Sequence, residues 1–248
     1  MQNQDQWQAS KYVWRDGHLA PSLDERELGR GSRLIAGRVA AHYERALATY
    51  AGGRLLDLGC GKVPLYSAYR DRVSEAVCVD WAQTLHRNPH LDLECDLSQP
   101  LPLSTASFDT VLLSDVLEHI PEPAVLWNEM ARVLRPGGHL LMNVPFLYWL
   151  HEEPHDYYRY TEHALRRGAA GAGLEVLALD RIGGAPEVLL DITGKLIARW
   201  RPGMRRLAWA VHGLGCRWLE TASGRRASKN TAGPFPLGYF LVARRAAQ

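Results

Sequence analysis

Short apolar runs alternate along the chain with amphipathic segments, and this alternation predicts the main secondary-structure elements. Between residues 33 and 50 the apolar side chains recur every three or four residues, a spacing that predicts a helix with one apolar stripe. Further along, strands are expected at 54–58, 76–80, 108–114 and 139–144, and helices between them at 64–72 and 123–134. Because strands and helices alternate, the pattern predicts a largely parallel, doubly wound α/β sheet.

The last third of the chain continues the pattern less regularly. Thr161 is a candidate N-cap for a helix that runs through Ala170, since its hydroxyl can accept from a free N–H of the first turn. Strands are expected at 174–179 and 239–245. Residues 183–233, between these two strands, are expected to form an irregular insertion with helical stretches.

A glycine-rich turn follows the first strand, in the order Asp57-Leu58-Gly59-Cys60-Gly61. Glycine tolerates positive φ and lets a ligand lie against the backbone, and a strand, a turn and a helix in this order open nucleotide-binding sheets. A dinucleotide-binding turn would carry a third small residue at position 64, where this chain has Pro64. The turn therefore favours a cofactor other than NAD.

Two further acids follow strand-like runs. Asp80 ends the second run about twenty residues after the glycine turn, the offset at which such folds place a ribose-binding carboxylate. Asp96 ends the segment 91–96 in the same way. Carboxylates accept hydrogen bonds from ribose hydroxyls and exocyclic amines, and charged acceptors form the stronger bonds. The two acids therefore indicate a ligand with a nucleoside part.

The ordered set of the glycine turn, the two acids, the 108–114 strand with Glu118-His119, and the segment 132–138 resembles the class I S-adenosylmethionine (SAM) methyltransferases. Within that family it is most similar to the small-molecule and glycan branch, which includes methyltransferase type 11. The resemblance implies a Rossmann-like, seven-stranded, mostly parallel sheet with an antiparallel last strand and helical lid insertions. It also implies SAM as the cofactor and S-adenosylhomocysteine as the product.

The same resemblance assigns expected roles to individual residues. The glycine turn is expected against the methionine part of SAM, Asp80 on the ribose hydroxyls and Asp96 on the adenine amino group, with Trp81 over the adenine face. The full set of expected cofactor-binding residues is Asp57, Gly59, Gly61, Asp80, Trp81, Asp96, Leu97 and Ser114. We divide the chain into an N-terminal helical lid or cap segment, 1–50, and a SAM-binding domain, 51–248, with acceptor-site insertions at 145–162 and 183–233.

Methyl transfer from SAM needs little chemistry from the protein, because the methyl group is already activated and the acceptor must mainly be aligned with it. If the acceptor is a hydroxyl, a base takes its proton, and the candidates are His155, His151 and His119, in that order. The stretch from His151 to Tyr160 resembles one that borders the acceptor pocket in many members of this branch. The expected acceptor-binding residues are Tyr148, Glu152, Asp156, Tyr157, Tyr158 and Arg159.

Residues 151–156 hold two histidines and three acids, which are also the donor types of a metal site. Pro154 interrupts the run, however, and no regular helix spacing puts His151 and His155 on one face. The sequence therefore predicts no metal ion and metal-independent turnover. Structural capping is the remaining alternative to acceptor binding for this cluster.

Charge and composition bear on partners and location. The 248 residues carry a formal net charge of +2, which argues against a dedicated nucleic-acid binder. Residues 195–229 are nevertheless basic, with Glu220 as their one acid and tryptophans among the bases. A solvated basic face over the acceptor pocket and a peripheral contact with an anionic membrane are the first two interpretations of this segment. Nucleic-acid binding is the third, because arginines alternate with aromatic residues but no nucleic-acid module is recognised. The four cysteines lack metal-site spacing, so a reducing, cytoplasmic compartment is expected, at the membrane surface in the second interpretation.

The sequence thus predicts a SAM-dependent methyltransferase that acts on a hydroxyl of a small molecule or of a sugar in a glycan or glycolipid. Three alternatives stay open. The chain could be a non-catalytic SAM-fold binding protein, although one would not need to keep Gly59, Gly61, Asp80 and Asp96 together. It could instead methylate nitrogen or carbon on a different small molecule, or be an NAD-dependent oxidoreductase, against which Pro64 counts.

Overall fold

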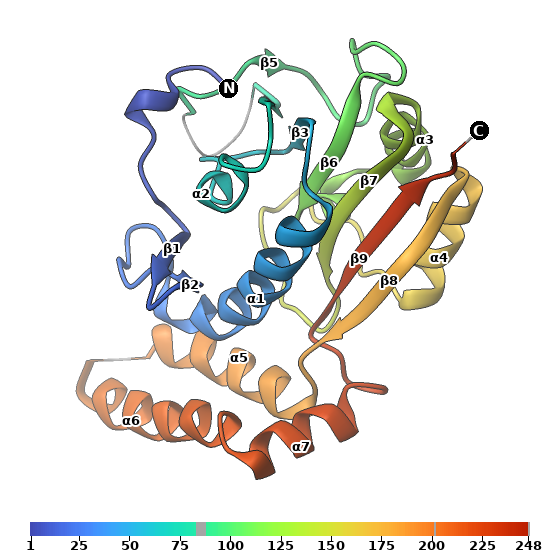
Figure 1. Cartoon of the computed structure of the whole chain (residues 1–248). Coiled ribbons are helices and arrows are strands. Elements are labelled where there is room, and N and C mark those ends of the chain that lie inside the picture. The colour runs from blue at the N-terminus through green and yellow to red at the C-terminus, as the bar shows by residue number, and fades with distance from the viewer. Residues whose placement is uncertain (83–87, 201, 248) are drawn as a thin grey trace.

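A seven-stranded sheet lies at the centre of the computed structural model, which describes residues 1–82, 88–200 and 202–247 (Figure 1). Its order is β5-β4-β3-β6-β7-β9-β8. The strands are β3 (Arg54–Leu58), β4 (Glu75–Asp80), β5 (Leu93–Glu94), β6 (Phe108–Ser114), β7 (Leu134–Pro145), β8 (Leu174–Ile182) and β9 (Gly238–Arg245). β9 runs antiparallel to both of its neighbours, and the other pairs are parallel. The predicted fold class is confirmed.

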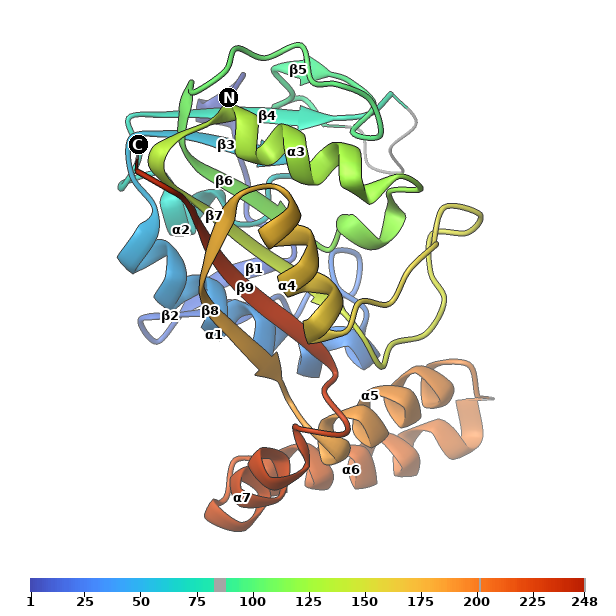
Figure 2. The same ribbon diagram turned by 90° about the vertical axis from the view of Figure 1, so that its right-hand side faces the viewer.

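Helices cover both faces of this sheet. Figures 1 and 2 show α1 (Arg33–Tyr50) and α2 (Tyr66–Tyr69) on one face and α3 (Pro123–Val133) and α4 (Glu162–Gly171) on the other. Because successive side chains of a strand point to opposite faces, β6 contributes Leu112 to the apolar core under α1 and α2. Val111 and Leu113 of the same strand lie in the core under α3 and α4.

Several elements differ from the predicted boundaries, and α2 and β7 differ in ways that the backbone explains. Helix α2 covers only Tyr66–Tyr69, because Val63 adopts a left-handed φ of 51° and delays the helix beyond Pro64. Strand β7 starts at Leu134 and not at His139, because Gly137, with a φ of 82°, and a register shift in the pairing with β6 absorb the extra residues as a bulge.

The N-terminal segment contains a β-hairpin that we did not predict from the sequence. Strands β1 (Tyr12–Arg15) and β2 (His18–Pro21) pair antiparallel through a two-residue turn at Asp16 and Gly17, both with positive φ. Asp-Gly between two strands is a strong hairpin signal, so the sequence did contain the information. Short 3-10 helices η1 (Gln4–Gln6) and η2 (Arg30–Ser32) flank the hairpin, and β2 packs against α1. The division into a lid at 1–50 and a domain at 51–248 stays a prediction.

The long segment between β8 and β9 is regular, in contrast to the irregular insertion that we expected. It forms three helices, α5 (Ala185–Ala198), α6 (Pro202–Leu219) and α7 (Ala222–Thr231), which lie together below the sheet in Figure 2. Helix α5 packs against η2, α1 and α6. Arg201, one of the basic residues of this segment, lies outside the described residues. Across the described chain, none of the helices combines the length and the apolar character needed to cross a membrane.

Candidate active site

A cavity of about 670 Å³ opens at the carboxyl ends of β3, β4 and β6, where parallel α/β sheets bind their ligands. It has two ends. The residues predicted to bind the cofactor all line it, namely Asp57, Gly59, Gly61, Asp80, Trp81, Asp96, Leu97 and Ser114. From the predicted acceptor site, it is lined by His119, Glu152, His155 and Tyr157.

The glycine turn shapes the cofactor end through its backbone. Gly59 and Gly61 have φ values of 65° and 49°, in the left-handed region that favours glycine. A Cβ on Gly59 would lie 2.5 Å from Cγ2 of Val116, whereas a Cβ on Gly61 would meet nothing within 4 Å. The turn is tied to β4, because Asp80 accepts hydrogen bonds from the N–H groups of Gly61 and Trp81, both at 2.8 Å.

Asp57 is a buried acid at the floor of the same end. Burial raises its pKa to about 7, although the hydroxyl of Tyr69 donates to it at 3.2 Å. A buried carboxylate of this kind is ionised more readily when a cation lies close by. A ligand with a positively charged group, such as the sulfonium or the ammonium of SAM, suits this position.

The other residues at this end differ in what they offer a ligand. Asp96 is exposed and accepts from the N–H and the hydroxyl of Ser98 at 2.8 and 2.7 Å, which orients its carboxylate in a tight turn. Leu97 is buried and supplies apolar surface. The hydroxyl of Ser114 donates to Oδ1 of Asn143 at 2.9 Å. Open glycine backbone, two oriented carboxylates, an apolar wall and a buried acid together fit SAM.

At the acceptor end, His155 is the histidine most directly joined to the cofactor end. Its ring packs edge-on against Trp81, with centroids 5.1 Å apart, and its Nδ1 lies 3.2 Å from the hydroxyl of Tyr157. Nδ1 of His119 lies 2.8 Å from the backbone oxygen of His155. His119 belongs to the 3-10 helix η3 (Leu117–His119), which follows β6, so this contact fixes the loop to the sheet edge.

The remaining predicted acceptor residues do not line the cavity. Asp156 and Arg159 form two hydrogen bonds at 2.5 and 2.7 Å, and the same arginine donates to the backbone oxygens of Tyr148 and Trp149. The hydroxyl of Tyr158 donates to the backbone oxygen of Pro121 at 2.9 Å. In the structure these contacts hold the loop in shape. A role of these residues in binding the acceptor stays a prediction.

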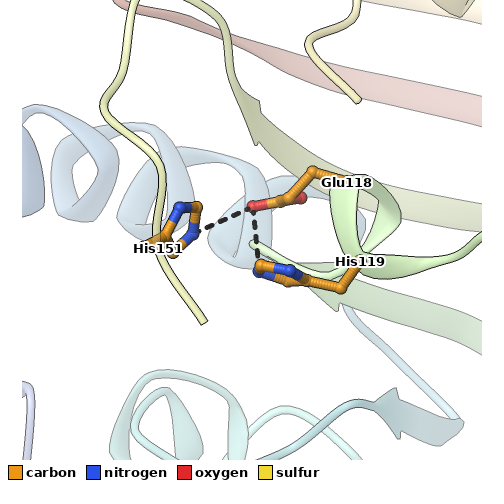
Figure 3. A group of neighbouring side chains, drawn as sticks. All are labelled: Glu118, His119 and His151. Atoms are coloured by element: carbon orange, nitrogen blue, oxygen red, sulfur yellow. Dashed lines mark ion pairs between the residues drawn. The ribbon is translucent and has the colours of Figure 1, made fainter. Parts of the chain in front are cut away.

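His151 turns away from the cavity, towards a buried acid. Figure 3 shows the rings of His119 and His151 directed at the same oxygen of Glu118, whose Oε1 lies 3.7 Å and 3.8 Å from their Nε2 atoms. Glu118 is fully buried, and burial raises its pKa well above the usual range. Burial, and then the neighbouring His119, lower the pKa of His151.

Sequence reasoning gave no role to several residues of this region. Lys11 and Asp115 both line the cavity, and Nζ of the lysine lies 3.0 Å from Oδ2 of the aspartate. Asp115 directly follows β6, so the rule that identified Asp80 also points to it. Glu118 was part of the resemblance without a function. Nothing in the sequence around Lys11 indicates that it reaches a site more than a hundred residues away.

Comparisons with known proteins identify the family. The family described as "Methyltransferase domain" matches residues 56–142. An uncharacterized methyltransferase of Mycobacterium sp. (strain KMS) is 32% identical over 201 residues, which cover 72% of this chain and 78% of that protein. The ubiquinone biosynthesis O-methyltransferase of Idiomarina loihiensis is 30% identical over 102 residues, which cover 37% of this chain and 42% of that enzyme.

Among solved structures, the [4+2]-cyclase SpnF superposes with a TM-score of 0.60 at 20% identity, covering 97% of this chain and 88% of that one. At this identity the likeness shows the fold alone. The Mycobacterium relative, matched over most of both chains, shows the family, and the cavity is lined by the residues predicted to bind the cofactor. The chain therefore belongs to the class I SAM-dependent methyltransferases, with a methyltransferase type 11 domain and SAM as its cofactor.

Proposed function

We propose that this methyltransferase acts on a hydroxyl group of a small molecule or of a sugar in a glycan or glycolipid, with His155 as the general base. One observation carries the proposal: a single cavity joins the cofactor residues to a second end lined by His119, His155 and Tyr157. The partial match to a ubiquinone O-methyltransferase supports oxygen as the acceptor atom.

Bound SAM supplies an activated methyl group, so the work of the chain is to position the acceptor and to take its proton. Tyr157 presents aromatic surface beside His155 and suits a sugar or aromatic ring packed flat against it. His155 takes the proton of the acceptor hydroxyl on Nε2, while the contact of Nδ1 with the hydroxyl of Tyr157 holds the ring in place. Glu152, exposed at the cavity, is available for hydrogen bonds from further hydroxyls of the acceptor.

A screen with methyl-labelled SAM tests the acceptor class. Panels of phenols, free and lipid-linked sugars, amines and activated carbon acids should be offered to the wild-type chain. Label is expected in the hydroxyl panels, as an ether that resists mild acid. Label only in amines or carbon acids would replace the proposal by N- or C-methylation, and binding of SAM without transfer to any panel would favour the non-catalytic alternative.

A peripheral contact with an anionic membrane is the second part of the proposal, and it rests on the surface of α5 and α6. Each helix carries a stripe of exposed large apolar side chains at helical spacing. The stripe residues are Leu189, Ile192, Leu196 and Trp200 along and just after α5, and Leu207, Val211, Leu214 and Trp218 along α6. Helices α5 and α6 pack against each other, and Nε2 of His212 lies 2.9 Å from the backbone oxygen of Leu190, so the two stripes belong to neighbouring helices.

Charge around this apolar surface matches an anionic bilayer. Helices α5, α6 and α7 together form a helical unit. Its exposed bases are Arg199, Arg205, Arg206, Arg217, Arg225, Arg226 and Lys229. Interfacial helices with apolar stripes and flanking arginines bind such surfaces, at about 1 kcal/mol for each base near the headgroups. The guanidinium of Arg199 lies 5.0 Å from the ring centroid of Trp149, so the surface continues into the loop that borders the acceptor end. This continuity suits an acceptor that is presented from a lipid surface.

Cosedimentation with vesicles tests the contact. The wild-type chain should bind phosphatidylglycerol vesicles and bind phosphatidylcholine vesicles weakly. The double substitution Val211→Asp and Leu214→Asp should lower binding by about tenfold or more, because it removes apolar burial and adds charge repulsion. Leu23→Asp is the matched control, since Leu23 is an exposed leucine outside the helical unit. A stable dimer that the double variant breaks would assign the surface to a second copy of the chain.

A further inference from the structure

Behind the acceptor end of the cavity, three side chains converge with their potential acceptor atoms facing one another. Glu118 and His119 come from η3, and His151 comes from the loop that follows β7. One carboxylate oxygen and the two Nε2 atoms all lie within 4.8 Å of one another (Figure 3). Both oxygens of Glu118 and Nε2 of His119 are buried, and within the described residues they have no hydrogen-bond partner.

In each histidine ring, the contacts of Nδ1 determine which of the two nitrogens carries the proton. Nδ1 of His119 faces the backbone oxygen of His155 at 2.8 Å, and a carbonyl can only accept, so Nδ1 is the donor. Nδ1 of His151 faces Oδ2 of Asp156 and the backbone oxygen of Trp149, both at 3.3 Å, and both are acceptors. In the neutral rings, each Nε2 therefore presents a lone pair towards Glu118.

Three acceptors that face one another in a buried site need a shared proton or a metal cation between them. The outer contacts are those of metal-binding histidines, which donate their second N–H to a carbonyl or a carboxylate and are oriented by it. Asp156 is itself held by Arg159. This arrangement gives each ring a fixed direction before any ion arrives, which a purely structural cluster would not need.

We propose that Glu118, His119 and His151 form a binding site for a divalent transition-metal ion of the zinc class. Bonds of about 2.0–2.2 Å place neighbouring donors of a tetrahedral ion about 3.4 Å apart, so the observed 3.7 and 3.8 Å to Glu118 need to close by a few tenths of an ångström. The two histidine nitrogens, which lie within 4.8 Å of each other, need a larger ring movement of up to about 1.4 Å. Two imidazoles with one carboxylate suit zinc and its neighbours in the series more than magnesium or calcium, which prefer oxygen. His119 also lines the cavity, as does Glu152, whose Oε2 lies 3.9 Å from Nε2 of His119. The site therefore adjoins the acceptor end.

This site differs from the one that the sequence argued against. The absence of a metal was predicted from the spacing of His151 and His155, whereas the structure pairs His151 with Glu118 and His119 from a distant segment. The ion would tie the acceptor loop to the edge of the sheet. The proposal does not depend on the acceptor or on the general base, because metal binding is measured without methyl transfer.

Metal binding by the full chain, freed of any histidine tag and stripped with a chelator, tests the site. Titration with zinc should reach one equivalent per chain, and cobalt at the same stoichiometry should give the visible absorption of a tetrahedral ion. Glu118→Gln and His151→Ala should each weaken zinc by at least tenfold. Asp156→Asn, which alters the support of His151 and the pairing with Arg159, should weaken it by about 10–100-fold. His163→Ala is the matched control, because this histidine is exposed on α4, and it should bind zinc as the wild type does.

Circular dichroism and SAM affinity show whether each variant is folded, since none of these residues lines the cofactor end. If Glu118→Gln does not fold, His151→Ala and the cobalt spectrum of the wild type decide the question. Substoichiometric zinc in the wild type would overturn the proposal, as would equal zinc affinity in the ligand variants and His163→Ala. The buried acceptors would then share protons, and the metal-free prediction would stand.

Discussion

The two ends of the cavity are held in place by different parts of the protein. At the cofactor end, Asp57 and Asp80 sit on neighbouring strands, and the ladder between β3 and β4 sets their separation. At the acceptor end, His155 is positioned by side-chain and loop contacts, to His119, Tyr157 and Trp81. Substitutions at the cofactor end should therefore change SAM affinity or stability, whereas substitutions at the acceptor end should change turnover.

The largest expected effect is at the acceptor end. Replacing His155 by Ala should lower kcat by about 10²–10⁴-fold, because the acceptor hydroxyl loses its base. SAM affinity should stay within about twofold, since the loss concerns only the transition state. Steady-state kinetics on an acceptor from the screen, with calorimetry of SAM binding, measures both. His163→Ala is the control, and equal kcat in the two variants would show that positioning alone drives transfer.

The second-largest expected effect is the loss of stability when a glycine of the turn gains a Cβ. Gly59→Ala should destabilise the protein by about 2–4 kcal/mol, because the residue keeps a positive φ and its Cβ meets Val116 at 2.5 Å. Gly61→Ala has a similar φ but open space, so about 1–2 kcal/mol is expected. Thermal unfolding of both variants isolates the steric part. Equal melting temperatures would mean that the close approach to Val116 carries no cost.

Removing Asp80, the predicted hydrogen-bond acceptor for the ribose hydroxyls, should have a smaller effect. Asp80→Ala should weaken SAM by about 1.5–3 kcal/mol, the scale of a hydrogen bond to a charged group. Asp80→Asn keeps one acceptor oxygen and should recover part of that loss, and NAD should not bind to either form. Calorimetry with SAM and with NAD makes the measurement. Unchanged SAM affinity in Asp80→Ala would remove this residue from the cofactor end.

The smallest effect concerns the hydrogen-bond chain that supports Ser114 and Asp115 at the end of β6. The hydroxyl of Tyr43 on α1 donates to Oδ1 of Asn143 at 2.7 Å, and the amide of Asn143 donates to Asp115 at 2.5 Å. Tyr43→Phe should cost about 1 kcal/mol, or roughly 2–4 °C in melting temperature, because Ser114 still donates to the same oxygen. Tyr50→Phe is the control, as its ring packs on His139 without a hydrogen bond of its hydroxyl among the described residues. A larger loss in the control would contradict this assignment.

Sequence alone was sufficient to predict that the proposed cofactor residues line one cavity, and the reason is physical. The carboxyl ends of parallel strands meet at one edge of a sheet. A polar residue at the end of such a strand is therefore expected at that edge. Asp57, Asp80 and Ser114 follow this rule, and all three line the cavity. The glycine turn was readable for a similar reason, because positive φ at Gly59 is a local property of the backbone.

The acceptor end could not be read in the same way, because its contacts join segments that are far apart in the chain. Lys11 meets Asp115 across 104 positions, and His119 meets the backbone of His155 across 36. Helical or strand spacing within 151–156 therefore says nothing about Glu118, which completes the cluster with His151. The β1–β2 hairpin is a different case, since its Asp16-Gly17 turn was a local signal that we did not use.

A crystal structure of the chain with S-adenosylhomocysteine tests the two-ended cavity most directly. The ribose hydroxyls are expected to donate to Asp80, the adenine amino group to Asp96, and the homocysteine part to lie along Gly59 and Gly61. The sulfur should then face the side of the cavity lined by His155. A ligand bound outside this cavity, or one whose sulfur points away from His155, would contradict the account.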